Sequence, residues 1–244
     1  MNLLVIPARW GSTRFPGKPL AMIGGLPMVV RTWRACRRAM VFDEVVVATD
    51  DVRVYDECQR SGCNSIMTGE CRNGTERCAE AAIKGYGLAD DELVVNVQGD
   101  EPLMDPVIPQ RVLMNLKLRP ERVWTAVRDL KLGELENPNI VRLQVRNEKA
   151  WNFSRYDDLV STHAHLGIYG YSVAKLREYS KKEPDLRETA EGLEQLRWSE
   201  SLSCITVDYD GIGVDRAEDI ARVEERLRSN RRHPTSLVAT VSAG

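Results

Sequence analysis

Short, almost continuously apolar segments recur through the first half of the chain, each separated from the next by a longer amphipathic stretch. The apolar segments are residues 3–8, 44–50, 92–100 and 123–127, and most of them are rich in valine. Between them, residues 28–40, 75–86 and 106–118 place apolar side chains on one side at helical spacing. Strands that are apolar on both faces and alternate with helices are typical of a parallel sheet covered on both sides. The first half therefore predicts a doubly wound α/β sandwich.

The pattern changes after about residue 134. Residues 137–145 and 165–173 alternate like antiparallel or mixed strands, and helices are predicted at 173–181 and 188–200. A last strand at 203–209 precedes a helix for which Asp215 is a good N-cap, because apolar residues follow it at helical spacing. We expect a smaller mixed β element in this half of the chain.

Composition disfavours several classes of protein. A formal net charge of −2 argues against a general electrostatic surface for nucleic acid. No apolar run approaches the roughly 18 residues of a membrane span, and the N-terminal residues are typical of a core strand and not of a signal peptide. The six cysteines include no CxxC pair, and His163 and His165 lack an evident third ligand. We expect reduced thiols, no zinc and a cytoplasmic location.

A cationic loop follows the first predicted strand. Arg9, Arg14 and Lys18 stand among glycines and prolines between residues 8 and 20. The loop is not a Walker A motif, because its glycine spacing differs and Pro19 stands where the motif requires serine or threonine. Three cations on a constrained loop can nevertheless hold a polyphosphate. A solvated basic turn is the alternative.

Polar residues also end the next two predicted strands. Thr49, Asp50 and Asp51 follow the second, and the sequence Gln-Gly-Asp-Glu at 98–101 follows the third. Ligands of open parallel sheets bind beyond the carboxyl ends of the strands, where these residues would meet the cationic loop. Carboxylate oxygens suit Mg²⁺, and substrate phosphates complete its coordination. The sequence therefore predicts a magnesium site that includes Asp100.

Motifs along most of residues 3–226 resemble, in unbroken order, the CMP-Kdo synthetases, the cytidylyltransferases that activate 3-deoxy-manno-octulosonate (Kdo). The motifs are IPAR-GSTR-PGKPL, VVVATDD, GTER-AE, VNVQGDEPL, NPN-V, FSR, HLGIYGY, LEQLR and GVD--ED. The resemblance implies a three-layer α/β/α sandwich of the nucleotide-diphospho-sugar-transferase type with a mostly parallel sheet. It also implies a homodimeric, Mg²⁺-dependent enzyme that transfers CMP from CTP to the anomeric hydroxyl of a sugar acid, as in lipopolysaccharide synthesis. Neither nucleic acid nor membrane insertion is expected.

The same resemblance implies the domain organisation. Residues 1–230 would form a single cytidylyltransferase domain. Its first part, 1–130, would bind the nucleotide, and 131–230 would bind the sugar acid and form the dimer. Residues 231–244 would be a flexible tail.

Roles for individual residues also follow from the resemblance. The catalytic residues would be Arg9, Arg14, Lys18 and Asp100. Asp100 and Asp215 would hold Mg²⁺, although local sequence alone favours Asp215 as a helix N-cap. The nucleotide site would comprise Ala8, Arg9, Arg14, Lys18, Thr49, Asp50, Gly74, Thr75, Arg77 and Gln98. The sugar-acid site would comprise His165, Tyr169, Glu194 and Gln195. Simple turn chemistry is the alternative for the small polar residues of the nucleotide site, and a solvated or salt-bridged helix carboxylate is the alternative for Glu194.

Departures from the family pattern gather on the acceptor side. Ala164 stands where family members usually have arginine. The segment 156–163 is shorter than in the family and acidic. The residues before the GTER motif also differ, since the sequence reads ECRNGTER. We therefore expect CTP chemistry on Kdo or a modified Kdo-like acid, with Asp157 and Asp158 suited to a cationic substituent. The alternatives are a nucleotidyltransferase for another acceptor, such as a sialic-acid-like sugar or a sugar 1-phosphate, and a non-catalytic nucleotide-binding regulator.

Overall fold

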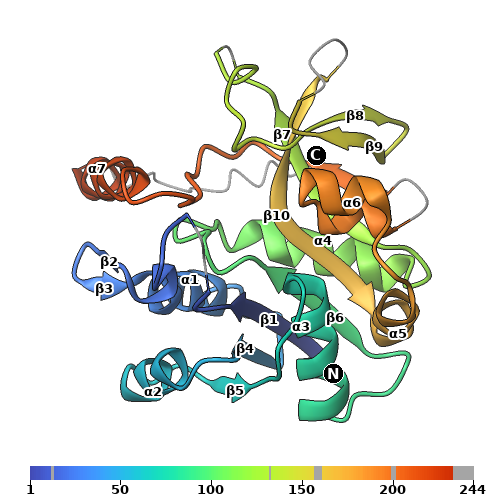
Figure 1. The fold of residues 1–244 in the computed structure, drawn as a ribbon, viewed down its shortest axis with the longest axis horizontal. Coiled ribbons are helices and arrows are strands. Elements are labelled where there is room, and N and C mark those ends of the chain that lie inside the picture. Colours follow the sequence, from blue (N-terminus) through green and yellow to red (C-terminus); the bar gives the residue numbers. More distant parts are fainter. Residues whose placement is uncertain (12–13, 132, 157–160, 199–201, 233–244) are drawn as a thin grey trace, which may run out of the picture.

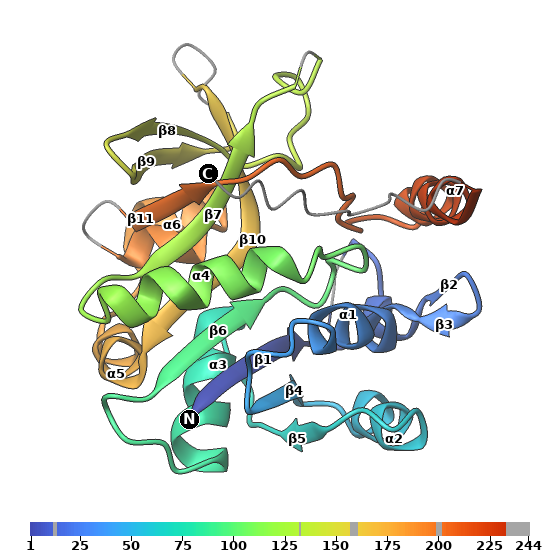
Figure 2. The ribbon, with the colours of Figure 1, turned by 180° about the vertical axis from the view of Figure 1, so that it is seen from behind.

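A single nine-stranded mixed sheet forms the centre of the molecule, with helices on both faces (Figures 1 and 2). The computed structural model describes residues 1–11, 14–131, 133–156, 161–198 and 202–232. The strand order in the sheet is β5-β4-β1-β6-β10-β7-β11-β9-β8. These strands are β1 (Asn2–Ala8), β4 (Glu44–Thr49), β5 (Ser65–Met67), β6 (Leu93–Val97), β7 (Trp124–Asp129), β8 (Arg142–Arg146), β9 (Lys149–Ser154), β10 (His163–Ser172) and β11 (Leu202–Thr206). A separate short hairpin joins β2 (Met22–Ile23) to β3 (Leu26–Pro27).

Helices lie at the predicted positions 28–40, 75–86, 106–118 and 173–181, whereas the helix at 52–60 was not predicted. The helices are α1 (Met28–Arg37), α2 (Val52–Arg60), α3 (Gly74–Glu80), α4 (Val107–Leu118), α5 (Val173–Lys181), α6 (Leu186–Glu191) and α7 (Asp219–Arg232), with short helical turns η1 (Lys18–Leu20), η2 (Ala81–Gly85) and η3 (Glu194–Arg197). The expected helix at 188–200 is wrong as one continuous element. Gly192 adopts φ 64° at the end of α6, a left-handed conformation that stops the helix, and η3 then starts in a new direction.

Two cores lie on opposite faces of the parallel strands. Successive side chains of a strand point to opposite faces. Leu4 and Ile6 of β1 accordingly join the cluster that includes α1, α2 and α4, whereas Leu3 and Val5 join the cluster that includes α3 and α5. Burial on both faces is the reason that these strands are apolar throughout. The predicted three-layer α/β/α sandwich is confirmed.

The second half of the chain extends the same sheet. β10 lies antiparallel between β6 and β7, with Ile168 opposite Val97 and Tyr169 opposite Thr125. Beyond β7, β11 is parallel to it, and the β8–β9 hairpin completes that edge. The expected mixed β element is thus appended to the parallel sheet, so residues from both halves meet in one layer.

The prediction of Asp215 as the N-cap of the last helix is wrong. α7 begins four residues later, and the carboxylate of Asp219 accepts hydrogen bonds from the backbone N–H groups of Asp215 and Arg216. Asp219 therefore stabilises the start of α7, and the side chain of Asp215 is left for other contacts. Most of the predicted tail, residues 233–244, lies outside the described residues.

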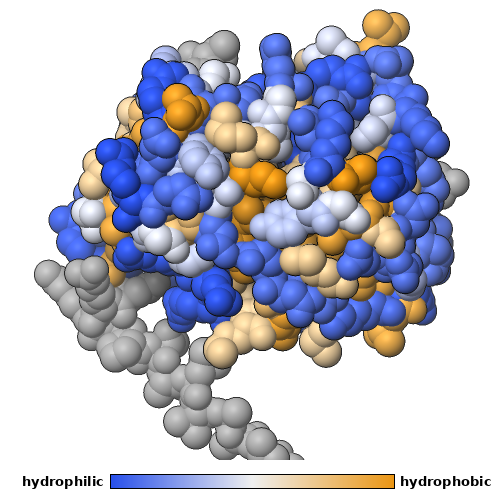
Figure 3. Space-filling model, turned by 90° about the horizontal axis from the view of Figure 1, so that it is seen from below, coloured by the Kyte–Doolittle hydropathy of each residue, from blue (hydrophilic) through white to orange (hydrophobic). Residues whose placement is uncertain are grey.

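The molecular face in Figure 3 is mainly hydrophilic, with hydrophobic side chains visible in its middle. Within the described part of the chain, none of the helices combines the length and the apolar character needed to cross a membrane.

Candidate active site

A cavity of about 1070 Å³ opens beyond the carboxyl ends of β1 and β6. Its volume is at the upper end of the usual range for ligand sites, so it has room for two small substrates. Most of the predicted site residues line it, namely Ala8, Arg9, Arg14, Lys18, Gly74, Arg77, Gln98, Asp100, His165, Tyr169, Glu194, Gln195 and Asp215. Thr49, Asp50 and Thr75 lie outside this lining.

Two cations and two carboxylates meet at one end of the cavity. The Lys18 Nζ lies 2.6 Å from the Asp100 Oδ2 and 4.0 Å from the Asp215 Oδ1. Arg14 donates from Nη2 to the Asp215 Oδ1 at 3.0 Å. Burial raises the pKa of Asp215, and the charge of Asp100 adds to the effect, whereas Lys18, Arg14 and Arg155 oppose it. Both carboxylates are thus within reach of a single positive charge.

This carboxylate pair fits a magnesium ion. Both groups supply hard oxygen ligands, and Mg²⁺ is commonly bound by one or two protein carboxylates together with water and substrate phosphates. No cluster of three or more His, Cys, Asp or Glu side chains suitable for a metal occurs in the described ranges. Asp100 and Asp215 therefore require substrate oxygens to complete a metal site.

Backbone contacts bring these distant residues together. The Val214 N–H donates to the Asp100 carbonyl at 2.9 Å, which fixes Asp215 beside the turn after β6. Lys18 also donates to the Val214 carbonyl at 3.0 Å. The cationic loop is anchored on its other side by Trp10, because the Arg53 guanidinium lies 3.5 Å from the centroid of its ring. Trp10 was not among the residues predicted from sequence, although its position inside the cationic loop was a signal.

Three residues expected at the cytidine site bond to other groups of the protein. The Thr49 hydroxyl accepts a hydrogen bond from the Asp51 N–H, and Asp50 forms an ion pair with Arg77 at 2.6 Å. The Arg77 side chain is almost completely buried. The Thr49 contact is the turn chemistry that the sequence left open, whereas the Asp50–Arg77 pair joins the end of β4 to α3. A role in base recognition stays a prediction for all three residues.

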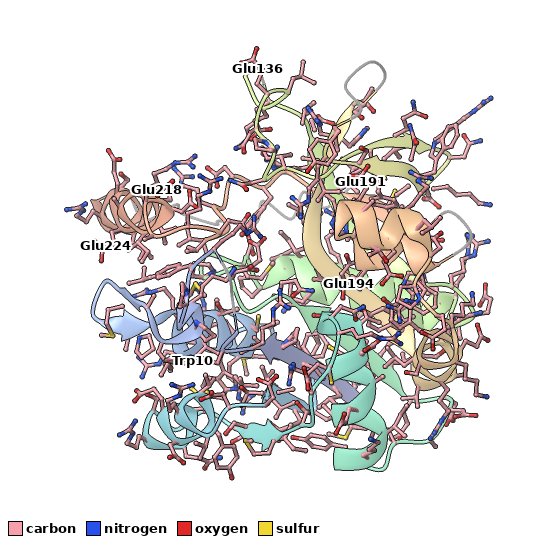
Figure 4. The ribbon with its side chains drawn as sticks, viewed as in Figure 1. Trp10, Glu136, Glu191, Glu194, Glu218 and Glu224 are labelled. Atoms are coloured by element: carbon pink, nitrogen blue, oxygen red, sulfur yellow. The ribbon has the colours of Figure 1, made fainter. Side chains whose placement is uncertain are left out.

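Glu194 joins the two sides of the cavity. Its carboxylate accepts hydrogen bonds from the Thr75 N–H and from the Gln98 Nε2, each at 2.8 Å. A Cβ atom at Gly74 would lie only 2.7 Å from the Gln98 Nε2, so glycine permits this close approach. Burial raises the pKa of Glu194 to about 7, against the hydrogen bonds from Thr75. Figure 4 shows Glu194 between α6 and the end of α3, and the alternative of a solvated helix carboxylate is wrong.

His165 presents a neutral ring to the cavity. Its Nε2 lies 2.8 Å from the Thr125 hydroxyl, which itself donates to the Ile168 carbonyl at 2.7 Å. Since the hydroxyl proton is used in that second bond, the His165 Nε2 must be the donor and Nδ1 keeps its lone pair. Burial and the nearby Arg155 lower the pKa of His165 to about 3. Next to it, Tyr169 donates to the Gln195 Oε1 at 3.1 Å.

Arginines near the acceptor wall were missed from sequence. Arg155 lines the cavity, and its Nη1 donates to the carbonyls of Pro138 and Asn139. Ala164 pairs across the sheet with Arg128 on β7 and Arg142 on β8. Positive residues on neighbouring strands thus flank the position where the family usually has arginine. The FSR motif was a signal for Arg155. Arg128 and Arg142 could not be placed beside Ala164 without the register of the strands. Asp157 and Asp158 lie outside the described residues.

Glu101, which the sequence places next to Asp100 in the same strand-end motif, is a carboxyl beside the Asp100–Asp215 pair. Burial and the charge of Asp100 raise its pKa to about 8, although the Tyr209 hydroxyl donates to it at 3.1 Å. In the unfolded chain the group would titrate near its ordinary value, about 4.5. Between these two pH values the folded state holds more protons, so this group's contribution to stability is complete below pH 4.5 and is lost as the pH rises towards 8.

Glu101→Gln is accordingly expected to flatten the pH dependence of the free energy of unfolding. The variant should lose roughly 3 kcal/mol less stability than the unchanged protein between pH 5 and pH 8, since each pKa unit corresponds to about 1.4 kcal/mol. Urea unfolding in EDTA at both pH values measures this difference, with the exposed Glu178→Gln as the control. An unchanged pH slope in Glu101→Gln would show that the carboxyl is ionised in the folded protein.

The fold and this arrangement define a nucleotidyltransferase-like α/β protein. A glucose-1-phosphate thymidylyltransferase from Bacillus anthracis shares the fold, with a TM-score of 0.68 at 12% identity over 93% of this chain and 94% of that one.

Sequence comparison defines the family. The sequence model described as Cytidylyltransferase matches residues 3–221. The mitochondrial 3-deoxy-manno-octulosonate cytidylyltransferase of Arabidopsis thaliana is 41% identical over 92% of this chain and 82% of its own length. The enzyme of that name from Myxococcus xanthus is 40% identical over 93% of this chain and 97% of its own. A solved CMP:2-keto-3-deoxy-manno-octonic acid synthetase complexed with CTP has a TM-score of 0.83 at 32% identity, covering 94% of this chain and 99% of that chain. The chain belongs to the cytidylyltransferase family.

Proposed function

We propose that this protein transfers CMP from CTP to the anomeric hydroxyl of Kdo and releases pyrophosphate. The observation that carries the proposal is one cavity with two chemically different ends. Cations and the Asp100–Asp215 pair occupy one end, and the neutral His165 with Tyr169 and Gln195 occupies the other. The relatives from Arabidopsis thaliana and Myxococcus xanthus, both named 3-deoxy-manno-octulosonate cytidylyltransferase, support the same substrates.

At the nucleotide end, the chain would act by binding and orienting charge. Arg9, Arg14 and Lys18 would hold the triphosphate, and Asp100 with Asp215 would hold Mg²⁺. When bound, Mg²⁺ would neutralise charge on the phosphoryl oxygens. The anomeric oxygen attacks the α-phosphorus, and the bond from that phosphorus to the leaving pyrophosphate breaks. No covalent bond to the enzyme is needed, so catalysis depends on positioning and on charge stabilisation.

At the acceptor end, hydrogen-bonding groups would recognise the sugar acid. The free lone pair of the His165 Nδ1 suits a sugar hydroxyl, and the Gln195 Nε2 is buried without a protein partner among the described residues. Arg155 lines the cavity and would supply positive charge for the carboxylate of the sugar acid. It would do so in a region where this chain has Ala164 in place of the arginine usual in the family. The homodimer expected from the family resemblance is part of this proposal.

Pyrophosphate release tests the proposal. Purified protein with Mg²⁺ is incubated with CTP and, in turn, Kdo, an amino-substituted Kdo or a sialic acid, and then with UTP, GTP or ATP in place of CTP. We expect release with CTP and Kdo, little with the other nucleotides, and none in EDTA. Turnover of the amino sugar but not of Kdo would favour the modified acceptor that Ala164 suggests. CTP binding without pyrophosphate release from any acceptor would favour a regulator.

A further inference from the structure

A buried arginine ties the acceptor side of the cavity to the nucleotide side. Arg197 is the last residue of η3, and its side chain is only 2% exposed. It donates from Nη1 to Glu76 on α3 at 2.7 Å, and from Nε and Nη2 to Glu188 on α6 at 2.8 and 2.5 Å. All three guanidinium nitrogens are therefore bonded to a carboxylate, and three separate elements meet at this one side chain.

The network continues to the first residues of α3. Asn73 caps that helix, because its Oδ1 accepts from the Glu76 N–H at 2.9 Å. Its Nδ2 donates to the Tyr179 hydroxyl at 3.0 Å, and the Arg197 guanidinium lies 4.3 Å from the centroid of the Tyr179 ring. Burial raises the pKa of Glu76, yet hydrogen bonds from Arg197 and Arg72 lower it overall, so this carboxylate stays ionised.

Residues that the family resemblance assigns to the two substrates sit on the same two elements. The N-terminal turn of α3 carries Gly74 and Thr75, which the family resemblance assigns to the nucleotide, and η3 carries Glu194 and Gln195, which it assigns to the acceptor. Glu194 already bonds to the Thr75 N–H. Arg197 adds charge-assisted bonds that join η3 to α3 through Glu76, and such bonds are about twice as strong as neutral ones.

We propose that Arg197 is a positioning residue that couples nucleotide binding to acceptor binding, because it holds the N-terminal turn of α3 and η3 as one unit. The inference rests on the proposed function. A ligand at either site orders both elements, so the second ligand binds to a site that is already arranged. Removing one partner of a buried ionic network leaves the others unpaired, so the two elements then move independently.

Calorimetry of a non-reacting pair of ligands tests this coupling. CMP and Kdo without pyrophosphate cannot turn over, so the Kd of CMP is measured with and without saturating Kdo. In the unchanged protein we expect Kdo to tighten CMP binding about tenfold. In Arg197→Lys the factor should fall to about twofold or less, because an ammonium cannot bond both carboxylates in the planar arrangement of a guanidinium. Steady-state kinetics of this variant should show the KM values rising more than kcat falls.

Two further variants make the test decisive. Arg177→Lys changes an arginine on α5 that pairs with Asp90 at the surface at 2.7 Å, and it should keep the tenfold coupling. Glu188→Gln removes the negative charge that pairs with Arg197 and changes the shape of the side chain little. It should lose the coupling as Arg197→Lys does. It also keeps the inference testable if Arg197→Lys does not fold. Full coupling in a folded Arg197→Lys or Glu188→Gln, or no coupling in the unchanged protein, would overturn the inference. Absence of any binding of CMP or Kdo to the unchanged protein would instead refute the proposed function itself.

Discussion

Replacing Asp100 by asparagine is expected to lower kcat at least about 100-fold, the order typical of losing a metal or oxyanion contact. The amide removes the negative charge that pairs with Lys18 and that would hold Mg²⁺. Folding should be little affected, because Asp100 also repels its neighbours and raises the pKa of both Glu101 and Asp215. Pyrophosphate release measures the rate, and urea unfolding measures the stability.

The matched control for this variant is Asp90→Asn. Asp90 also forms an ion pair, with Arg177, but its side chain is 69% exposed and remote from the cavity. Its replacement should leave kcat within about twofold, since surface ion pairs contribute little. If Asp100→Asn kept near-normal turnover while the protein stayed folded, the assignment of Asp100 to the metal would be wrong.

Lys18→Met is expected to reduce kcat/KM for CTP by about 100-fold or more. The variant loses the cation that lies between Asp100 and Asp215, and with it a charge for the triphosphate. It should also be less stable in EDTA, because the two carboxylates then repel each other without a counter-charge, and Mg²⁺ should restore part of that stability. Initial rates over a range of CTP concentrations, and thermal unfolding with and without Mg²⁺, measure the two effects.

Lys18→Arg and Lys175→Met complete the comparison. The arginine keeps the charge and should recover part of the activity, whereas Lys175 pairs with Glu178 on the outer surface of α5 and should be dispensable. An unchanged kcat/KM in Lys18→Met would exclude this lysine from triphosphate binding.

Local periodicity was sufficient to predict most of the elements. The helix expected at 173–181 coincides with α5, and the apolar runs coincide with the central strands, because burial on both faces imposes continuous apolar sequence. The errors occur where tertiary structure overrides a local signal. Gly192 interrupts a helical pattern, and Asp215 contacts Arg14 across 201 positions of sequence instead of capping a helix.

The sequence indicated which side chains would lie together where the chemistry stands in short motifs at strand ends, although the roles of these residues stay predictions. Lys18 and Asp100 could be placed together because the carboxyl ends of parallel strands meet at one edge. Arg128 could not be placed at the site from sequence, because its position beside Ala164 depends on the register between β7 and β10. The raised pKa of Glu101 arises from burial, which no local pattern reveals.

A crystal structure of the protein with CTP and Mg²⁺ tests the central claim most directly. The account predicts one metal ion bound by both Asp100 and Asp215, with the triphosphate against Arg14 and Lys18 and the cytosine towards the N-terminal turn of α3. A nucleotide bound outside this cavity, or two carboxylates too far apart to share the ion, would contradict it.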